Sequence, residues 1–592
     1  MDLKKRSEMN KEYMWDVSHI FETKEKWEEA LKSASEKIAI LKDLKGTLCE
    51  SAASLKSAFD KTYDTIYETE LVYLYASLLK SSDNGDSEYQ EMEGKAITLY
   101  VSLQTALAFF DPELLSMSEE KAKEFLECEE LKNYRHILED TLRGKPHVLS
   151  EECETMLAKL SDAASTPDNA FEMLESVDMI FPKITDENGE EHQLTHGNFM
   201  VFRESKSADV RKDAFEKYFG EFKKYVNTFA AMYAGNVKFD NYFADVKHFD
   251  SALSKALFSS NVPTKVYDSL VEAIHEGLPI MKDYLSLRKK ALGLEKLSMY
   301  DLYCPMIEDV DFEIPYEEAQ TLVLEATKPL GEEYQKLLKK AFSEKWIDVY
   351  ENHGKTTGAF SCGVYGVHPY VLLNYTNTLD DAFTVAHELG HAMHSYLSAQ
   401  ANDFANSDYK ILVAEVASTV NEVLLTKYLL KKETDKKRRA YILNHFLEGF
   451  RTTVYRQTLF AEFERKAHEM QQSGETLTAK SLSKVYRDLN LLYYDGAEVP
   501  EIQDYEWARI PHFYRAYYVY QYATGFCSAV AIANKILETN DASDYLKFLS
   551  TGGSDYPINE LKIAGVDLTD PKSISYALSV FRESLNELSE II

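Results

Sequence analysis

Five consecutive residues, His387-Glu388-Leu389-Gly390-His391, carry the clearest chemistry in this sequence of 592 residues. On an α-helix, residues four apart lie about 40° apart around the axis, so both imidazoles can reach one metal ion. Glu388 follows His387 directly, and its carboxylate can contact a water molecule at that metal without being a ligand. A metal that activates water, beside a carboxylate that takes the proton, is a combination that hydrolyses amide bonds.

A catalytic zinc ion needs a third protein ligand and keeps its fourth position open for water. His394 shares the helix face of His391, but three ligands from one helix would crowd one side of a tetrahedral ion. We therefore expect a structural or supporting role for His394. The remaining candidates are glutamates on a helix predicted over residues 411–430. Glu415 is the predicted ligand, and Glu422, on the same face, is the alternative or a residue that supports a ligand.

The elements around the motif are expected to hold it rigidly. Its helix is predicted over residues 380–400, and Thr378 and Asp381 have the spacing of a helix start. Short apolar runs at 346–350 and 368–375 predict strands just before that helix. Both histidines then fall in the middle of a helix, where the backbone is rigid.

Several segments resemble the oligoendopeptidase F group of the thimet-oligopeptidase-like zinc metallopeptidases. The similar segments are residues 15–18, 300–303, 357–361, 368–374, 383–395 and 414–418. The resemblance implies a gluzincin centre, with His387, His391 and Glu415 on one zinc ion and Glu388 as the general base. It also implies a mainly α fold, in which two helical lobes flank a deep substrate channel and a small β-sheet lies beside the motif helix.

The same resemblance directs attention to an edge strand and to an aromatic segment. In gluzincins an edge strand beside the motif helix binds the substrate backbone, and we expect residues 371–374 to form part of that edge. A second donor must stabilise the oxyanion that forms during amide hydrolysis. By similarity to the family, His512 and Tyr520 are the predicted donors, and Tyr514 is the third candidate.

Composition narrows the class of protein and its compartment. The formal net charge of -32 argues against nucleic acid or an anionic membrane as a partner. The N-terminus lacks the apolar stretch of a signal peptide, and no stretch is long enough for a transmembrane helix. The six cysteines are scattered without C-x-x-C spacing, which is typical of reduced thiols. We expect a cytoplasmic protein.

The predicted organisation is an N-terminal helical domain over residues 1–200, forming part of the channel lid, and a catalytic domain over 201–592. A β-hairpin is predicted over 180–194, because Asn-Gly lies between two short extended runs. The predicted function is zinc-dependent hydrolysis of internal bonds in short oligopeptides. A carboxypeptidase or dipeptidyl carboxypeptidase is the main alternative and would need Arg509 or Arg515 to hold the substrate carboxylate.

A non-catalytic peptide-binding scaffold is a further alternative. It explains less of the sequence, because binding a peptide does not require Glu388 between the two histidines. The two alternatives, an enzyme and a binding scaffold, predict different effects of removing the Glu388 carboxylate. In an enzyme that loss abolishes hydrolysis, whereas in a scaffold it leaves peptide binding as the whole function.

Overall fold

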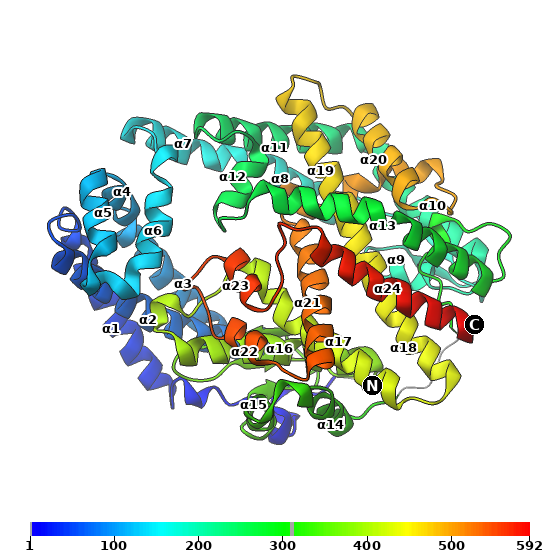
Figure 1. Ribbon diagram of the computed structural model, residues 1–592, viewed down its shortest axis with the longest axis horizontal. Helices are drawn as coiled ribbons and strands as arrows, with labels where there is room; N and C mark the ends of the chain where they lie inside the picture. The colour runs from blue at the N-terminus through cyan, green and yellow to red at the C-terminus, as the bar shows by residue number, and fades with distance from the viewer. Residues whose placement is uncertain (1–2, 308–312) are drawn as a thin grey trace. The chain divides into compact units, whose positions relative to one another are not determined.

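Helices make up most of the structure, as expected from a chain rich in Glu, Lys, Leu and Ala and poor in Gly and Pro (Figure 1). The computed structural model describes residues 3–307 and 313–592. The first helices are α1 Lys24–Leu41, α2 Ala52–Ser82, α3 Ser87–Leu107, α4 Phe110–Leu115, α5 Glu119–Glu127, α6 Arg135–Arg143, α7 Glu151–Ala164, α8 Thr166–Met173, α9 Phe199–Arg203, α10 Ala208–Lys224, α11 Val226–Val246, α12 Ala252–Phe258 and α13 Thr264–Ala291. The later helices are α14 Tyr316–Ala326, α15 Glu332–Ser343, α16 Leu379–Ala401, α17 Ile411–Lys432, α18 Lys436–Gly449, α19 Arg456–Gln472, α20 Ala479–Tyr493, α21 Tyr520–Thr539, α22 Ser543–Leu549, α23 Pro557–Ile563 and α24 Lys572–Ile591. The predicted mainly α class is confirmed.

Two compact units are interleaved along the chain. The first unit comprises Met1–Val148, Phe312–Tyr428 and Ile532–Val566, and the second comprises Leu149–Asp311, Leu429–Ala531 and Asp567–Ile592. The units therefore do not divide at residue 200. A lid built from residues 1–200 stays a prediction.

In the first unit, α1, α2 and α3 pack against one another around a shared apolar core. Trp27 is fully buried there, and its indole nitrogen donates a hydrogen bond to the carbonyl oxygen of Val72 at 2.8 Å. This bond satisfies the one polar group of a large buried side chain. It fixes α1 against the middle of α2.

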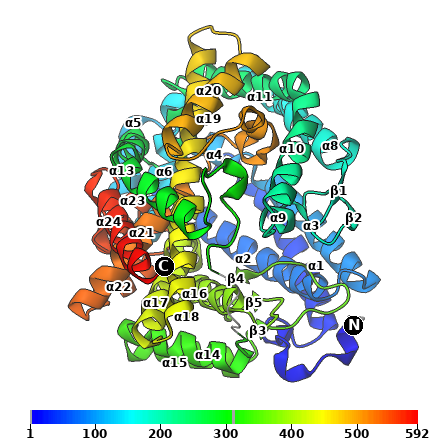
Figure 2. The ribbon, with the colours of Figure 1, turned by 90° about the vertical axis from the view of Figure 1, so that its right-hand side faces the viewer.

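A three-stranded sheet in the same unit lies beside α16 (Figure 2). Its strands are β3 Ile347–Asp348, β4 Phe360–Cys362 and β5 Tyr370–Leu372, in the order β3-β5-β4. Strand β5 pairs in parallel with β3 and antiparallel with β4. The predicted strands are confirmed, but the expectation that residues 371–374 form an edge is wrong, because β5 is paired on both sides. The edge next to α16 is β4.

The sheet is anchored by a buried ion pair. Asp348 on β3 lies 2.7 Å from the ammonium of Lys355, and both side chains are almost fully buried. Arg6 forms a second ion pair with the same carboxylate. Because charges this deep are costly unless they are paired, the pair ties the segment after β3 and the N-terminal segment to the sheet.

In the second unit, the strands β1 Lys183–Thr185 and β2 Glu191–Gln193 form an antiparallel hairpin. Gly189 takes a positive φ of 86° in its turn, so the predicted hairpin over 180–194 is confirmed. A buried ion pair joins Arg211 and Asp301 at 2.7 Å. In the described part of the chain, no helix has the length and hydrophobicity needed to cross a bilayer.

Candidate metal centre

Helix α16 carries the histidine pair, and a capping box fixes its first turn. The Asp381 amide donates to the Thr378 hydroxyl at 3.1 Å, and the Thr378 amide donates to the Asp381 carboxylate at 2.9 Å. These bonds satisfy amide groups that a helix start leaves without partners, and the acid suits the helix dipole. The helix predicted over 380–400 and its start signal are confirmed.

Helix α17 packs against α16 at very short range. A Cβ atom on Gly390 would lie 2.5 Å from the Cα atom of Ser418, so a side chain at this position would collide with the α17 backbone. Nearby, the side-chain amide of Asn421 donates to the carbonyl of Ala386 at 3.0 Å. The two contacts hold the glutamates of α17 against the histidines of α16.

Three side chains from these helices bring metal-binding atoms together. The Nε2 atoms of His387 and His391 are 3.2 Å apart, and Oε2 of Glu415 lies 3.7 Å from the first and 3.8 Å from the second. One ligand atom from each residue lies within 4.8 Å of the other two. Ligand atoms at about 2.1 Å from a tetrahedral ion lie about 3.4 Å apart, so this donor set fits one zinc ion.

Glu422 contacts the other nitrogen of His387. A short hydrogen bond joins Nδ1 of His387 and Oε1 of Glu422. Burial disfavours the charged form of His387, but this bond and the charges of Glu422, Glu388 and Glu415 outweigh it and raise the pKa of His387 to about 9. A carboxylate on the far nitrogen orients the ring and makes it a stronger ligand. In this geometry the Glu422 carboxylate meets Nδ1 of His387, whereas Nε2 of the same ring faces Glu415 and His391.

Glu388 lies between the two histidines in sequence and is 7% exposed. Burial raises the pKa of its carboxyl to about 7; the charge of His387 opposes the rise, and those of Glu415 and Glu422 add to it. A carboxyl that titrates near neutral pH can take up and release a proton during turnover. A cation bound nearby would lower this pKa, because it favours the ionised form.

His391 and His394 lie in different surroundings on the same helix. Burial lowers the pKa of His391 to about 3, which leaves its imidazole neutral and able to bind a metal. His394 is 1% exposed and stacks on Tyr409, with ring centroids 3.6 Å apart. Its ring is therefore part of the packing behind the metal centre.

The predicted oxyanion donors belong to the second unit. His512 lies in a short helical turn, Pro511–Tyr514, with the Tyr522 hydroxyl 3.4 Å from its Nε2. Tyr520 begins α21, is 3% exposed, and packs its ring 5.5 Å from that of Tyr267. Burial lowers the pKa of His512 and keeps its imidazole neutral at physiological pH.

Tyr514 has the surroundings of a packing residue. Its ring stacks on Phe171 at a centroid distance of 4.6 Å and meets Tyr233 edge-on at 6.1 Å. Burial raises the pKa of its hydroxyl far above the usual range, so the group stays protonated. These contacts account for an aromatic residue at this position without a role in chemistry.

Sequence reasoning missed two residues that position the centre, Gly390 and Asn421. Gly390 lies inside the motif helix, and a glycine inside a helix usually marks a close approach of backbones. Asn421 is fully buried in an apolar helix, and a polar residue there signals a required hydrogen bond. Both signals were present in the sequence.

A second group of possible ligand atoms comes from Asp186, Glu190 and His192. These residues lie at the turn of the hairpin in the second unit. The Asp186 carboxylate accepts hydrogen bonds from the amides of Asn188 and Glu190, each at 2.9 Å. Its contacts are those of a residue that stabilises a turn.

A mainly α fold with an H-E-x-x-H helix and a facing glutamate defines the class of helical metallopeptidases. The model of peptidase family M3 matches residues 201–580, and a model described as oligopeptidase F matches residues 113–181. The chain belongs to peptidase family M3 and is a metalloendopeptidase of the oligoendopeptidase F group.

Relatives of known name extend over nearly the whole chain. Oligopeptidase PepF of Bacillus subtilis is 45% identical over 99% of this chain and 88% of its own length. The oligoendopeptidase F homolog of Lactococcus lactis is 40% identical over 100% of this chain and 99% of its own. The crystal structure of oligoendopeptidase-F from Enterococcus faecium matches with a TM-score of 0.73 at 37% identity, covering 96% of this chain and 99% of that one.

Proposed function

We propose that the protein hydrolyses internal peptide bonds of short oligopeptides with one zinc ion, held by His387, His391 and Glu415. The observation that carries this proposal is the convergence of one ligand atom from each residue within 4.8 Å. Two imidazoles and one carboxylate are a typical ligand set of catalytic zinc in peptidases. When bound, zinc supplies a Lewis acid that activates water and polarises the carbonyl group of the substrate.

Glu388 is the proposed general base. Its carboxylate takes a proton from the attacking water and then delivers that proton to the nitrogen of the leaving amine. The buried position of Glu388 in a site rich in carboxylates keeps its pKa near neutrality, which supports both transfers. Glu422 holds the ring of His387 in the orientation that directs Nε2 toward Glu415 and His391.

His512 and Tyr520 are the proposed donors to the oxyanion, and Tyr514 is the third candidate. A neutral imidazole and a protonated phenol can each donate a hydrogen bond to a developing negative charge. The low pKa of His512 and the raised pKa of Tyr520 support those protonation states. The packing of Tyr514 on Phe171 makes it the weakest of the three.

Strand β4 is the proposed site of contact with the substrate backbone. It is an edge strand of the sheet and packs against α16. An extended peptide added to such an edge is held by main-chain hydrogen bonds, which provide affinity without requiring a particular side chain. The names of the relatives, oligopeptidase and oligoendopeptidase, support short peptides as the substrates.

An exopeptidase on the same scaffold would need a free arginine for the substrate carboxylate. Arg509 lies 3.7 Å from Glu506 and stacks over Tyr218, so its charge already has a partner. Mass spectrometry of a peptide blocked at both ends tests the distinction. An endopeptidase cuts this peptide internally, whereas an exopeptidase leaves it intact.

The test of the mechanism is Glu388→Gln. This variant keeps the size of the side chain but removes the proton acceptor, so we expect zinc content and peptide binding close to wild type and a loss of hydrolysis of at least about 1000-fold. Zinc is measured by atomic spectroscopy and hydrolysis with a quenched fluorescent peptide. Undiminished turnover would remove Glu388 from the mechanism.

A further inference from the structure

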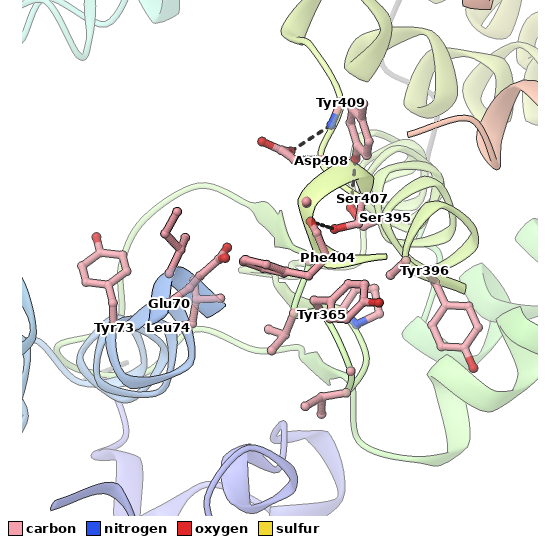
Figure 3. Close-up of a pocket in the computed structure, with 18 of the residues that line it drawn as sticks. Glu70, Tyr73, Leu74, Tyr365, Ser395, Tyr396, Phe404, Ser407, Asp408 and Tyr409 are labelled. Atoms are coloured by element: carbon pink, nitrogen blue, oxygen red, sulfur yellow. Dashed lines mark hydrogen bonds between the residues drawn. The ribbon is translucent and has the colours of Figure 1, made fainter. Parts of the chain in front are cut away.

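A large cavity opens in the first unit beside the metal centre (Figure 3). Its volume is about 1040 Å³. Its walls come from α2, α3, β4 with the loop after it, the second half of α16 and the loop before α17. Cavities of this size with mostly apolar walls and a few converging polar groups are typical ligand sites.

Two residues that line the cavity lie close in sequence to the proposed metal ligands. Ser395 lines it and lies one helical turn after His391 on the same face of α16. Ala414 lines it and directly precedes Glu415. An extended peptide that reaches the metal would therefore continue into this space.

Strand β4 forms part of the cavity wall through Ser361. The hydroxyl oxygen of Ser361 is buried and has no hydrogen-bond partner among the described residues. A buried hydroxyl without a partner costs free energy unless something else binds it. Ser361 therefore places an unpaired hydroxyl oxygen in the wall of the cavity.

Two carboxylates face the cavity from opposite sides. In Figure 3, Glu70 leaves α2 toward the open space, and Asp408 points into it from the loop before α17. Neither forms an ion pair with a lysine or arginine in the described part of the chain, although the charge of Lys410 acts on Asp408 and opposes the rise of its pKa. Burial and the charge of Asp408 raise the pKa of Glu70 to about 7, and burial raises that of Asp408. A cation between them would relieve both effects.

Aromatic rings form the wall next to Glu70. Phe404 packs against Tyr365, with ring centroids 5.4 Å apart, and against Tyr63 at 6.5 Å. Tyr73, three residues after Glu70, also lines the cavity. Ring faces attract cations, so a cation held by the carboxylates would gain further stabilisation from this wall.

We propose that this cavity is a specificity subsite that binds a cationic group of the substrate peptide between Glu70 and Asp408. The cation is an ammonium or guanidinium group, carried by a lysine or arginine side chain or by the free N-terminus. The subsite rests on the proposed function, because it takes peptides that extend from the proposed zinc centre.

The test compares peptides on the zinc-loaded wild-type enzyme. A peptide blocked at both ends carries one lysine, moved through every position, and each version is paired with norleucine at the same position. Norleucine keeps the apolar chain and removes the charge. We expect one position at which the lysine peptide has a kcat/KM about 10-fold to 100-fold higher. If the lysine and norleucine peptides have equal kcat/KM at every position, the cavity does not bind a charged side chain.

A second pair of peptides separates the two sources of the cation. It has norleucine throughout and differs only in a free or an acetylated N-terminus. If the cation is the N-terminus, the free amine gives the higher kcat/KM and the lysine scan shows no preference. If neither set shows a preference for charge, the proposal is wrong.

Variants of the two carboxylates test whether the preference for charged peptides arises in the cavity. In Glu70→Gln with Asp408→Asn, the ratio of kcat/KM between charged and uncharged peptides should fall to about 1. The control is Asp64→Asn, which removes one acid of α2 that is paired with Lys37 and does not line the cavity. A preference that survives the double variant would overturn the assignment. If the double variant does not fold, Glu70→Gln and Asp408→Asn are compared singly, and each should reduce the ratio.

Failure of the subsite and failure of the zinc mechanism give different results. If the mechanism is wrong, Glu388→Gln still hydrolyses peptides, whatever their charge. If the subsite is wrong, Glu388→Gln is inactive, but the wild-type enzyme cuts charged and uncharged peptides equally.

Discussion

Gly390 lies so close to Ser418 that a Cβ atom on the glycine would be 2.5 Å from the Cα atom of the serine. The contact sets the spacing between α16 and α17 at the level of the metal centre. Glu415 is three residues before Ser418, so this spacing also determines how closely its carboxylate approaches the two histidines.

We therefore predict that Gly390→Ala moves α17 away and weakens metal binding by about 10-fold or more while the helices remain folded. Competition with a chelator measures the affinity, and circular dichroism measures the helix content. The control is Gly94→Ala on α3, where a Cβ meets nothing within 4 Å. Its metal affinity should equal that of wild type, and an equal affinity for Gly390→Ala would refute the prediction.

Removal of the carboxylate behind His387 should also weaken the site. In Glu422→Gln the neutral amide replaces the charged acceptor at Nδ1, so we expect metal affinity to fall by about 10-fold to 100-fold. Competition with a chelator measures the metal affinity of this variant. Glu415→Gln should cost more, because it removes a proposed ligand. An identical loss in both variants would mean that Glu422 is itself a ligand.

The phenol of Tyr520 can be tested without disturbing its ring. Tyr520→Phe keeps the packing against Tyr267 and removes the donor, so kcat should fall by about 100-fold to 1000-fold while zinc content stays constant. Tyr514→Phe is the matched comparison and should change kcat little, since the Tyr514 ring packs on Phe171. If Tyr514→Phe lowers kcat and Tyr520→Phe does not, Tyr514 is the donor to the oxyanion and Tyr520 is the packing residue.

Stability should depend strongly on the buried ion pair at β3. Asp348→Ala leaves Lys355 charged and buried, which should cost about 3–5 kcal/mol and lower the unfolding temperature by several degrees. Glu88→Gln, which breaks the exposed pair with Lys24, should cost less than about 1 kcal/mol. Calorimetry of both variants makes the comparison. Similar unfolding temperatures would mean that Lys355 finds another partner.

The sequence was most informative where local rules apply. The capping pair Thr378 and Asp381 and the spacing of His387 and His391 depend on residues within one or two helical turns, and the structure has this helix as predicted. The hairpin around Gly189 was predicted for the same reason, because the turn itself requires a residue with positive φ.

Long-range pairing was harder to predict. Tyr370, Val371 and Leu372 are all buried, and a continuous apolar run is typical of a strand covered on both sides. That run does not show that β4 and β3 both pair with β5, and the edge predicted over residues 371–374 depends on this pairing. Spacing likewise placed Glu415 and Glu422 on one face of a helix. Which imidazole nitrogen each meets depends on how α17 packs on α16.

The interleaving of the two units affects how the chain folds while it is being synthesised. The first unit includes Ile532–Val566 and the second includes Asp567–Ile592, so each unit lacks a segment until more than 530 residues have been made. At about 5–20 residues per second, the ribosome needs about half a minute to two minutes for the chain. The parts of each unit that pack on these late segments must wait for them, whereas α1, α2 and α3 can already pack on one another around a core drawn from residues 27–138.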